Sequence, residues 1–481
     1  MRPVLLVAAV VAFVVALASI PHVASDGPPL RDFEAYYAAG QTWRYGGDAY
    51  ARDLWRSERL VPGVMATRDE LLPFVGPPYG LPLWSALGRL SFASASLVWA
   101  LALGLAVATV VLGSLRLAAG KLAWPQAIAA LLFAAAFAPL TGGIALGQVA
   151  LVSCAAIVVL PALLRPRLMF VAACGTLVAA LQPNLALVLA ARASDARARV
   201  TFGAAALVAA LGSALALGGP EGFAQYLRVL RDHGAAERFI AIQTSPGAVA
   251  YALGAPPAVA GGFALALAAV VVVTLGVQCT RGAFAPDARL MLACAALPLA
   301  LPFAHEHDYA IVFLPALVLV VRARRGAWAW SACAALALAV DWLGLAQRPN
   351  ALGATLAFSM AGACALAALA PGRLAAYHAA PLALVAAAVA TAGRIAATHR
   401  LPVWPDALPL DFHVAATLPA AVVWRAEQVA SGIAARDPVW GALRAIDLVA
   451  CAVVWAVATV VLRDDRARAA MAPPETRFAR D

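Results

Sequence analysis

Apolar runs long enough to span a bilayer recur along almost the whole chain, and they constrain its fold more than any other feature. A spanning helix needs about 20 mostly apolar residues. Of the 481 residues, 64% are hydrophobic and only 12% are charged, unlike a soluble domain. The chain is therefore predicted to be an all-α polytopic membrane protein. Twelve runs lie at 3–22, 95–117, 124–140, 144–164, 199–218, 259–279, 288–303, 308–322, 327–346, 351–370, 376–397 and 443–463.

Clusters of Lys and Arg between these runs indicate how the chain crosses the membrane. Cytoplasmic loops carry an excess of both residues. Placing every cluster inside predicts about 12 transmembrane helices with both termini in the cytoplasm. The net charge of +10 comes from these short clusters, so we expect no nucleic-acid partner. The clusters contain Arg2, Arg116, Lys121, Arg165, Arg167, Arg192, Arg197, Arg199, Arg281, Arg289, Arg322, Arg324, Arg325, Arg373, Arg463 and Arg466.

The segment 168–191 disturbs this alternation. It is long enough to cross once, which would place Arg192, Arg197 and Arg199 outside. The break at Gln182-Pro183-Asn184 instead favours two half-helices that fold back as a re-entrant hairpin. Because the hairpin keeps the arginines inside, we predict it, with a single crossing as the alternative.

Long polar loops fall on one predicted side only. Residues 1–463 are predicted to form a single integral membrane domain, followed by a cytoplasmic tail at 464–481. The outer loops span 26–80, 219–258 and 398–442, whereas the cytoplasmic loops are short. Function tends to lie on long loops, so we expect the site on the outer face. An amphipathic stretch at 221–228 is expected to lie on the membrane surface, in contact with lipids.

Seven cysteines are present, each within or at the edge of an apolar run, and none forms a Cys-x-x-Cys pair. We expect them to be small buried hydrophobic residues rather than disulfides or metal ligands.

The first outer loop places acids and tyrosines a few residues beyond the first apolar run. If residues 32–44 are helical, Asp32, Tyr36 and Gly40 share one face. A carboxylate beside aromatic rings suits a sugar site, because the rings stack on the sugar while the carboxylate accepts a hydroxyl proton. An interfacial aromatic belt with solvated acids is the alternative. The candidate substrate-binding residues of this loop are Glu34, Tyr36, Tyr37, Asp48 and Tyr79.

Titratable side chains occupy four consecutive positions from His305 to Asp308, between two apolar runs. Such a cluster in a membrane protein predicts a functional site. His305 and His307 could donate hydrogen bonds to a phosphate, or bind a metal with Asp308. The spacing lacks the i, i+4 histidines of zinc-hydrolase helices, so no metal site is predicted. A solvated tight turn is the alternative.

Two polar breaks and one basic segment complete the candidates. Gln148, which ends a Gly-rich stretch from Thr141, and Asn184 could line a cavity, since polar breaks in a membrane are tolerated there. Helix capping and a simple proline kink are the alternatives. Arg238, in the basic segment before Gln243, could hold a lipid phosphate, although ordinary headgroup contacts would also explain it.

In chain order, these motifs resemble those of glycosyltransferase family 87, the polyprenyl-phosphate-mannose-dependent mannosyltransferases of the C-type membrane glycosyltransferase superfamily. The resemblance covers roughly residues 1–325 and rests on Asp32–Gly40, Gly46–Tyr50, Phe74–Pro78 and Gly147–Val149. Two positions depart from the family pattern. Gln182 stands where Lys usually precedes the proline, and His305-Glu306-His307 stands where Trp-x-His is common.

The resemblance implies a GT-C-like fold and a membrane enzyme that makes a cell-envelope glycolipid or glycan. It would transfer a hexose, mannose foremost, from a polyprenyl phosphate sugar to a lipid or glycan acceptor, with inversion. The reaction would occur on the outer face of a bacterial cytoplasmic membrane, with no cofactor besides the lipid-linked donor. Asp32 would be the catalytic base, and His305, His307 and Arg238 would stabilise the leaving phosphate.

Two other functions were weighed against this one. A lipid or saccharide transporter or flippase predicts internal repeats and polar residues near the bilayer midplane. The chain shows no clear repeat, and its polar residues cluster at one face. A lipid-linked saccharide ligase or polymerase would use a diphosphate-linked donor and favours a large outer loop with paired arginines, which this chain lacks.

Overall fold

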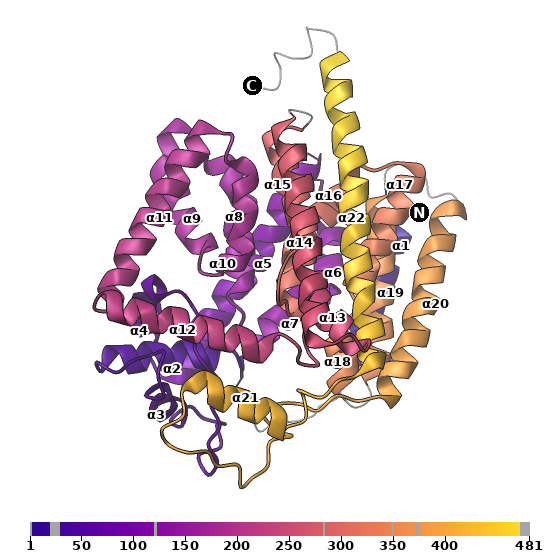
Figure 1. Cartoon of the computed structure of the whole chain (residues 1–481). Coiled ribbons are helices and arrows are strands. Elements are labelled where there is room, and N and C mark those ends of the chain that lie inside the picture. Colours follow the sequence, from indigo (N-terminus) through magenta and orange to yellow (C-terminus); the bar gives the residue numbers. More distant parts are fainter. Residues whose placement is uncertain are drawn as a thin grey trace.

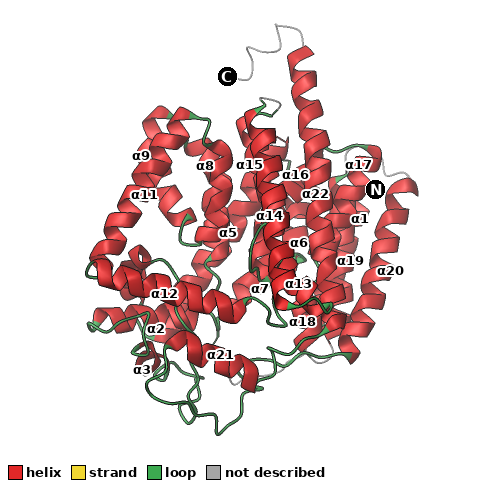
Figure 2. Ribbon diagram, in the orientation of Figure 1, coloured by secondary structure: helices red, strands yellow, loops and turns green. Residues whose placement is uncertain are grey.

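The chain is helical throughout the part that the structure describes. This computed structural model describes residues 2–19, 29–119, 123–281, 284–348, 351–370 and 376–471. No strand occurs among those residues, which confirms the all-α prediction (Figure 2). Lys121, Arg373, the start of the first outer loop at 26–28 and the end of the tail at 472–481 lie outside the described residues.

Many of the helices begin at a proline, which lacks the N–H that a helix start leaves unpaired. The α-helices are α1 (Arg2–Ala18), α2 (Phe33–Arg44), α3 (Leu54–Glu58), α4 (Leu81–Leu87), α5 (Phe92–Ala119), α6 (Trp124–Ala135), α7 (Ala138–Leu146), α8 (Ala150–Leu163), α9 (Met169–Ala179), α10 (Pro183–Ala186), α11 (Ala196–Ala216), α12 (Pro220–Glu237), α13 (Pro246–Ala252), α14 (Pro257–Thr280), α15 (Pro286–Ala296), α16 (Phe313–Arg322), α17 (Arg325–Leu338), α18 (Trp342–Gln347), α19 (Ala351–Leu369), α20 (Ala376–Thr398), α21 (Ala420–Ala430) and α22 (Pro438–Met471). Short 3-10 helices are η1 (Pro78–Gly80), η2 (Pro166–Leu168), η3 (Leu187–Arg192), η4 (Leu297–Leu299) and η5 (Glu306–Val312).

Several helices are long and apolar enough to cross a membrane. Among the described residues these are α5, α11, α14, α19 and the 438–463 part of α22. Helices α6 and α7 would form one more span, bent by 61° at their junction. Shorter apolar helices, α1, α8 and α9 among them, accompany these spans. The architecture is that of a multi-pass membrane protein, and the number of about 12 crossings stays a prediction.

The predicted outer loops gather at one end of the molecule, opposite the end toward which both termini lie (Figure 1). This end contains α2, α3, α12 and α21. The buried Arg68 donates from Nη1 to the carbonyl of Leu408 at 2.9 Å. The Asp69 N–H donates to the carbonyl of Phe412, also at 2.9 Å. The first and last of the three loops therefore form one layer over the helices.

Small residues allow close helix packing at this end. In α2, a Cβ at Gly40 would overlap the backbone of Trp84 and Ser85 in α4. Helix α2 covers most of the segment 32–44 for which a helix was considered, with Asp32 immediately before its first residue. The amphipathic stretch at 221–228 is part of the longer α12.

The segment 168–191 forms α9, then a break, then α10 and η3. Arg192 follows and pairs with Asp287 at the start of α15, with 2.6 Å between Nη1 and Oδ1. Whether this segment is re-entrant stays a prediction.

All seven cysteines are free. Cys154, Cys294 and Cys451 are buried, but Cys174 is exposed. The expectation of burial is wrong for Cys174, because α9 turns this side chain toward the surroundings of the molecule.

Candidate active site

Asp32 is held by the turn that follows α7. Its backbone N–H donates to the carbonyl of Leu146 at 2.8 Å, and its carboxylate accepts a hydrogen bond from Gln148 Nε2. Gly147 joins these two partners in a left-handed conformation, with φ of 81°. A Cβ there would approach Phe33 Cβ to 2.8 Å, so both conformation and space require glycine. Two predicted candidates, Asp32 and Gln148, are therefore in direct contact.

The surroundings of Asp32 make its carboxylate more basic than usual. Burial raises its pKa, while the hydrogen bond from Gln148 and the charges of His305 and Arg31 act in the opposite direction. The net effect is a pKa above the ordinary aspartate value. A base with a raised pKa accepts a proton from a hydroxyl group more readily.

His305 lies beside a buried carboxylate that the sequence did not single out. Its Nε2 is 3.3 Å from Oε2 of Glu237, the last residue of α12. Glu237 Oε1 accepts hydrogen bonds from Trp424 Nε1 at 2.5 Å and Gln428 Nε2 at 3.0 Å, both from α21. Gln243 Nε2 donates to Glu237 Oε2 at 2.9 Å. This carboxylate thus joins α12, α21 and the turn before η5.

The two partners stabilise each other's charge. Burial alone would raise the pKa of Glu237, but the hydrogen bond and the charge of His305 outweigh it and lower the pKa to about 2. Burial alone would lower the pKa of His305, yet Glu237, Asp308 and Asp32 raise it above the ordinary imidazole value. The site therefore holds an anionic Glu237 beside a histidine that favours its cationic form.

Asp308 connects the break before α10 to the same turn. Its Oδ2 accepts the backbone N–H of His305 at 3.0 Å, which caps η5. Its Oδ1 lies 3.4 Å from Asn184 Nδ2 and 3.5 Å from Gln182 Nε2. Both amides belong to the polar break that the sequence predicted to line a cavity. Asp308 therefore links two predicted candidates, since one of its oxygens binds the His305 backbone and the other lies beside Asn184.

His307 stacks on His305, with ring centroids 5.4 Å apart. Burial lowers the pKa of His307 to about 4, so the ring is neutral near pH 7. Because His307 and Asp308 are both buried, the segment differs from the solvated turn considered above. Within the described ranges, no three His, Cys, Asp or Glu side chains are grouped to hold a metal ion.

The tyrosines of the first loop have different surroundings. The centroid of the Tyr36 ring lies 4.8 Å from that of Trp84 and 5.9 Å from that of Phe74. These three rings form an aromatic cluster one helical turn from Asp32. Tyr37 and Tyr79 instead donate hydrogen bonds to backbone carbonyls, at Leu90 (2.8 Å) and Leu177 (2.9 Å). Their hydroxyl groups thus stabilise the packing of neighbouring segments.

Two other predicted residues lie apart from Asp32. Asp48 accepts hydrogen bonds from Gln225 Nε2 at 2.5 Å and from the Tyr50 N–H at 2.8 Å, and so fixes α12 to the first loop. Arg238 follows Glu237 directly but is exposed, and its guanidinium lies beside Gly261 of α14. The structure does not bring Arg238 into the group around Asp32.

Glu34 belongs to a second buried charge cluster next to Asp32. Arg31 Nη1 is 2.7 Å from Glu34 Oε2, and Arg31 also pairs with Glu70. Arg68 Nη2 binds the other oxygen of Glu70 at 2.7 Å. Burial raises the pKa of Glu34 to about 8, against the opposing charge of Arg31. Glu34 is therefore the member of this cluster that carries a proton near neutral pH.

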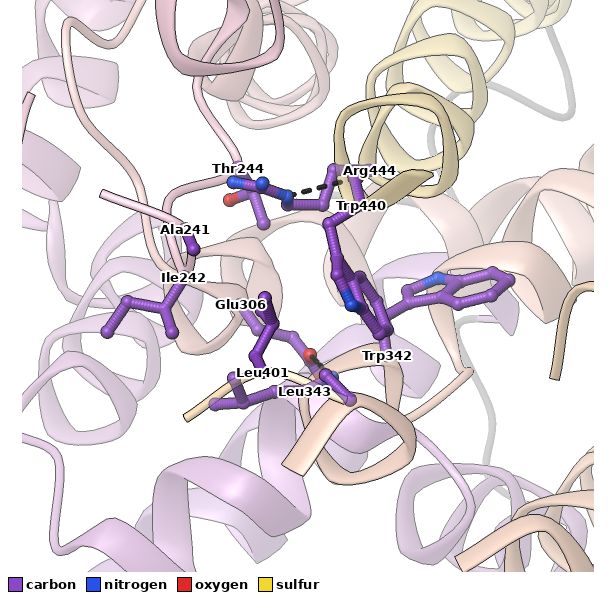
Figure 3. Close-up of a pocket in the computed structure, with 10 residues that line it drawn as sticks. Ala241, Ile242, Thr244, Glu306, Trp342, Leu343, Leu401, Trp440 and Arg444 are labelled. Atoms are coloured by element: carbon purple, nitrogen blue, oxygen red, sulfur yellow. Dashed lines mark hydrogen bonds between the residues drawn. The ribbon is translucent and has the colours of Figure 1, made fainter. Parts of the chain in front are cut away.

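A small cavity borders the far side of the 305–308 turn (Figure 3). Its volume is about 10 Å³, which is room for about one water molecule. Glu306 lines this cavity and accepts the Leu343 N–H at 2.8 Å. Arg444 of α22, also in the lining, donates to the carbonyl of Gln243. Helix α18 thus binds the turn through Glu306, and α22 binds the backbone of Gln243.

One comparison with known proteins gives a match that bears on this geometry. Residues 74–302 match the model of glycosyltransferase family 87. This match supports membership of glycosyltransferase family 87. No curated protein and no solved structure matches the chain.

The matched residues contain much of the site described above. They include Gln148, Asn184 and Glu237, together with the Phe74–Pro78 motif. Asp32 precedes the match and His305 follows it. Both residues contact the matched region, Asp32 through Gln148 and His305 through Glu237.

Proposed function

We propose that this glycosyltransferase transfers a hexose, mannose foremost, from a polyprenyl phosphate sugar to a lipid or glycan acceptor. The reaction would take place on the outer face of a bacterial cytoplasmic membrane and would invert the anomeric centre. One observation carries this proposal. A basic carboxylate, Asp32, and a charged pair, His305 with Glu237, are close enough for Asp32 and His305 to shift each other's pKa.

The proposed reaction needs one proton acceptor and one stabiliser of negative charge. Asp32 takes the proton of the acceptor hydroxyl as its oxygen attacks the anomeric carbon. The bond from that carbon to the phosphate oxygen breaks, and the oxygen leaves with the electron pair. A polyprenyl phosphate leaves as a stable anion, so a general acid is not needed. His305, held in its cationic form by Glu237, stabilises the charge that develops on the phosphate.

The predicted substrate contacts fit this arrangement to different degrees. Gln148 orients Asp32, and Asn184 with Asp308 positions the turn that carries His305. The Tyr36 ring supplies an apolar surface near Asp32 against which a sugar could stack. Arg238 lies outside this group, so a role in binding the phosphate would require a lipid that extends along α12 and α14.

The experiment that tests the proposal is a donor comparison with the purified full chain in lipid vesicles. Radiolabelled polyprenyl phosphate mannose, polyprenyl diphosphate mannose and a nucleotide-linked mannose are each offered with a mixed lipid acceptor extract. We expect label in product from the monophosphate donor alone, with an anomeric configuration opposite to that of the donor. Transfer from the diphosphate or nucleotide donor would contradict the proposal, as would movement of label across the vesicle membrane without product.

A further inference from the structure

A cavity of about 210 Å³ lies between the bent pair α6–α7 and helix α19, and it contains none of the residues assigned to the reaction. We call it the α7–α19 cavity. Its walls are built mostly from small side chains, including Ala138, Gly142 and Ala145 of α7 and Ala354 of α19, and Phe358 also contributes. The cavity lies where α6 and α7 meet at a bend of 61°.

One end of this cavity is charged. Asp341 and Arg348 both contribute to the lining, with 3.6 Å between Oδ2 and Nη1. The Arg348 side chain is 55% exposed, so its guanidinium is accessible to a ligand. The cavity thus combines apolar walls with a cation at its polar end, and this combination fits an amphiphile with an anionic head.

Two structural elements that border the cavity also contact the candidate active site. Helix α7 lines it and then ends at Leu146, whose carbonyl binds the backbone of Asp32. Asp341 begins α18, and the Leu343 N–H of that helix donates to Glu306, the neighbour of His305. A ligand in the cavity therefore lies between two segments that position Asp32 and His305.

The volume limits what can bind there. An apolar cavity of about 150 Å³ accommodates benzene, so about 210 Å³ has room for one branched five-carbon unit. A hexose would leave its hydroxyl groups without partners against alanine walls, which is unfavourable. A whole polyprenyl chain is far too large, and the remainder must extend into the bilayer.

We propose that the α7–α19 cavity binds the phosphate-proximal isoprene unit of the lipid-linked donor, with Arg348 facing the phosphate. This inference rests on the proposed function, because it assumes an isoprenoid phosphate donor. It adds Arg348 to the proposed donor-binding residues and explains how the enzyme could select the lipid of its donor. The enzyme would distinguish the branched isoprene unit from a straight alkyl chain of equal length by the fit of this first unit.

Gly142 offers a direct test, because a Cβ there meets open space. Gly142→Leu fills the cavity without a backbone clash. The matched control is Gly353→Leu in α19, where a Cβ also meets open space but the position is exposed and does not line the cavity. We expect Gly142→Leu to raise the KM for polyprenyl phosphate mannose about tenfold or more, with kcat changed by less than about twofold. Gly353→Leu should leave both constants unchanged.

Direct labelling separates this inference from the proposed function. The probe is polyprenyl phosphate without sugar, with a photoreactive diazirine on its first isoprene unit. We expect the native chain to be labelled on peptides of α7 and α19, Gly142→Leu to lose this labelling, and Arg348→Gln to weaken it, with partial recovery in Arg348→Lys. Labelling that maps elsewhere, or an unchanged KM in Gly142→Leu, would overturn the inference. Labelling at α7 and α19 without any sugar transfer would support isoprene binding in the cavity and contradict the proposed function.

Discussion

The Asp32 carboxylate and the His305 imidazole, though far apart in the chain, act on each other across the site. Each contributes to the shifted pKa of the other, in the direction that favours the charged forms. The proposed reaction requires this state, with Asp32 ionised and His305 protonated. Because both pKa values lie above the ordinary ones, the active window is displaced toward alkaline pH.

The pH dependence of transfer follows from these signs. As pH falls through the raised pKa of Asp32, the base becomes protonated and the rate drops. As pH rises through the raised pKa of His305, the cation is lost and the rate drops again. In Glu237→Gln the anion beside His305 is absent, so the alkaline limb should move to lower pH. At pH 7 we expect kcat to fall by about tenfold to a hundredfold.

The measurement is the rate of sugar transfer from pH 5 to 10 for the native chain and Glu237→Gln. Glu221→Gln, an exposed position in the first turn of the same helix, serves as the control and should match the native profile. An alkaline limb that does not move in Glu237→Gln would show that Glu237 does not tune His305.

Among the structural elements, α2 depends on its close approach to α4. A methyl group at Gly40 would overlap the backbone of Trp84 and Ser85, and backbone atoms cannot move aside as a flexible side chain can. We expect Gly40→Ala to destabilise the fold by about 1–3 kcal/mol, which is typical of overpacking. Thermal unfolding in detergent micelles measures this as a lower midpoint temperature.

The control for Gly40→Ala is Gly104→Ala in α5, where a Cβ meets open space. Alanine favours a helix over glycine, so this variant should be neutral or slightly more stable. Equal midpoints for Gly40→Ala and the native chain would contradict the packing account of α2.

Helices were predictable from the sequence where the spacing of polar and apolar residues over a short segment was regular. The spacing of polar and apolar residues indicated the amphipathic stretch at 221–228, which is part of α12, and suggested a shared face for Asp32, Tyr36 and Gly40 if that segment is helical. The predicted run at 124–140 instead ends at a bend and continues as α7. Pro139 lies at the start of α7, where a missing N–H is tolerated, so a continuous helix gives way to two.

The site was predictable only in part, since its contacts join distant segments. Gln148, Asn184 and Asp308 stood out because polar groups inside apolar runs are conspicuous. Glu237 did not, because a carboxylate in a polar amphipathic helix looks solvated in the sequence. Its burial depends on Trp424, which lies 187 residues further along the chain. No local pattern could reveal that contact.

For the molecule as a whole, the first and last outer loops depend on each other. The buried Arg68 binds Glu70 and the Leu408 carbonyl, and Asp69 accepts the Val414 N–H at 2.9 Å. Arg68→Ala leaves the Glu70 carboxylate without one of its two arginines. Breaking a buried ion pair costs about 3–5 kcal/mol, and here the cost falls on the layer that covers the site.

We therefore expect Arg68→Ala to detach the 401–418 segment from the first loop. Limited proteolysis should then cleave this segment faster, about tenfold or more, than in the native chain. Arg56→Ala in α3, an exposed position of the same loop, is the control and should leave the rate unchanged. An unchanged cleavage rate in Arg68→Ala would show that other contacts hold the layer in place.

The central claim is that Asp32 is the base of a membrane glycosyltransferase, and one measurement tests it most directly. Initial rates of transfer from radiolabelled polyprenyl phosphate mannose are compared for the native chain and Asp32→Asn, at equal amounts of folded protein. Asparagine keeps the size of the side chain but cannot accept the proton. The account predicts that transfer by Asp32→Asn falls by about a hundredfold to ten-thousandfold. Equal rates for the two proteins would contradict it.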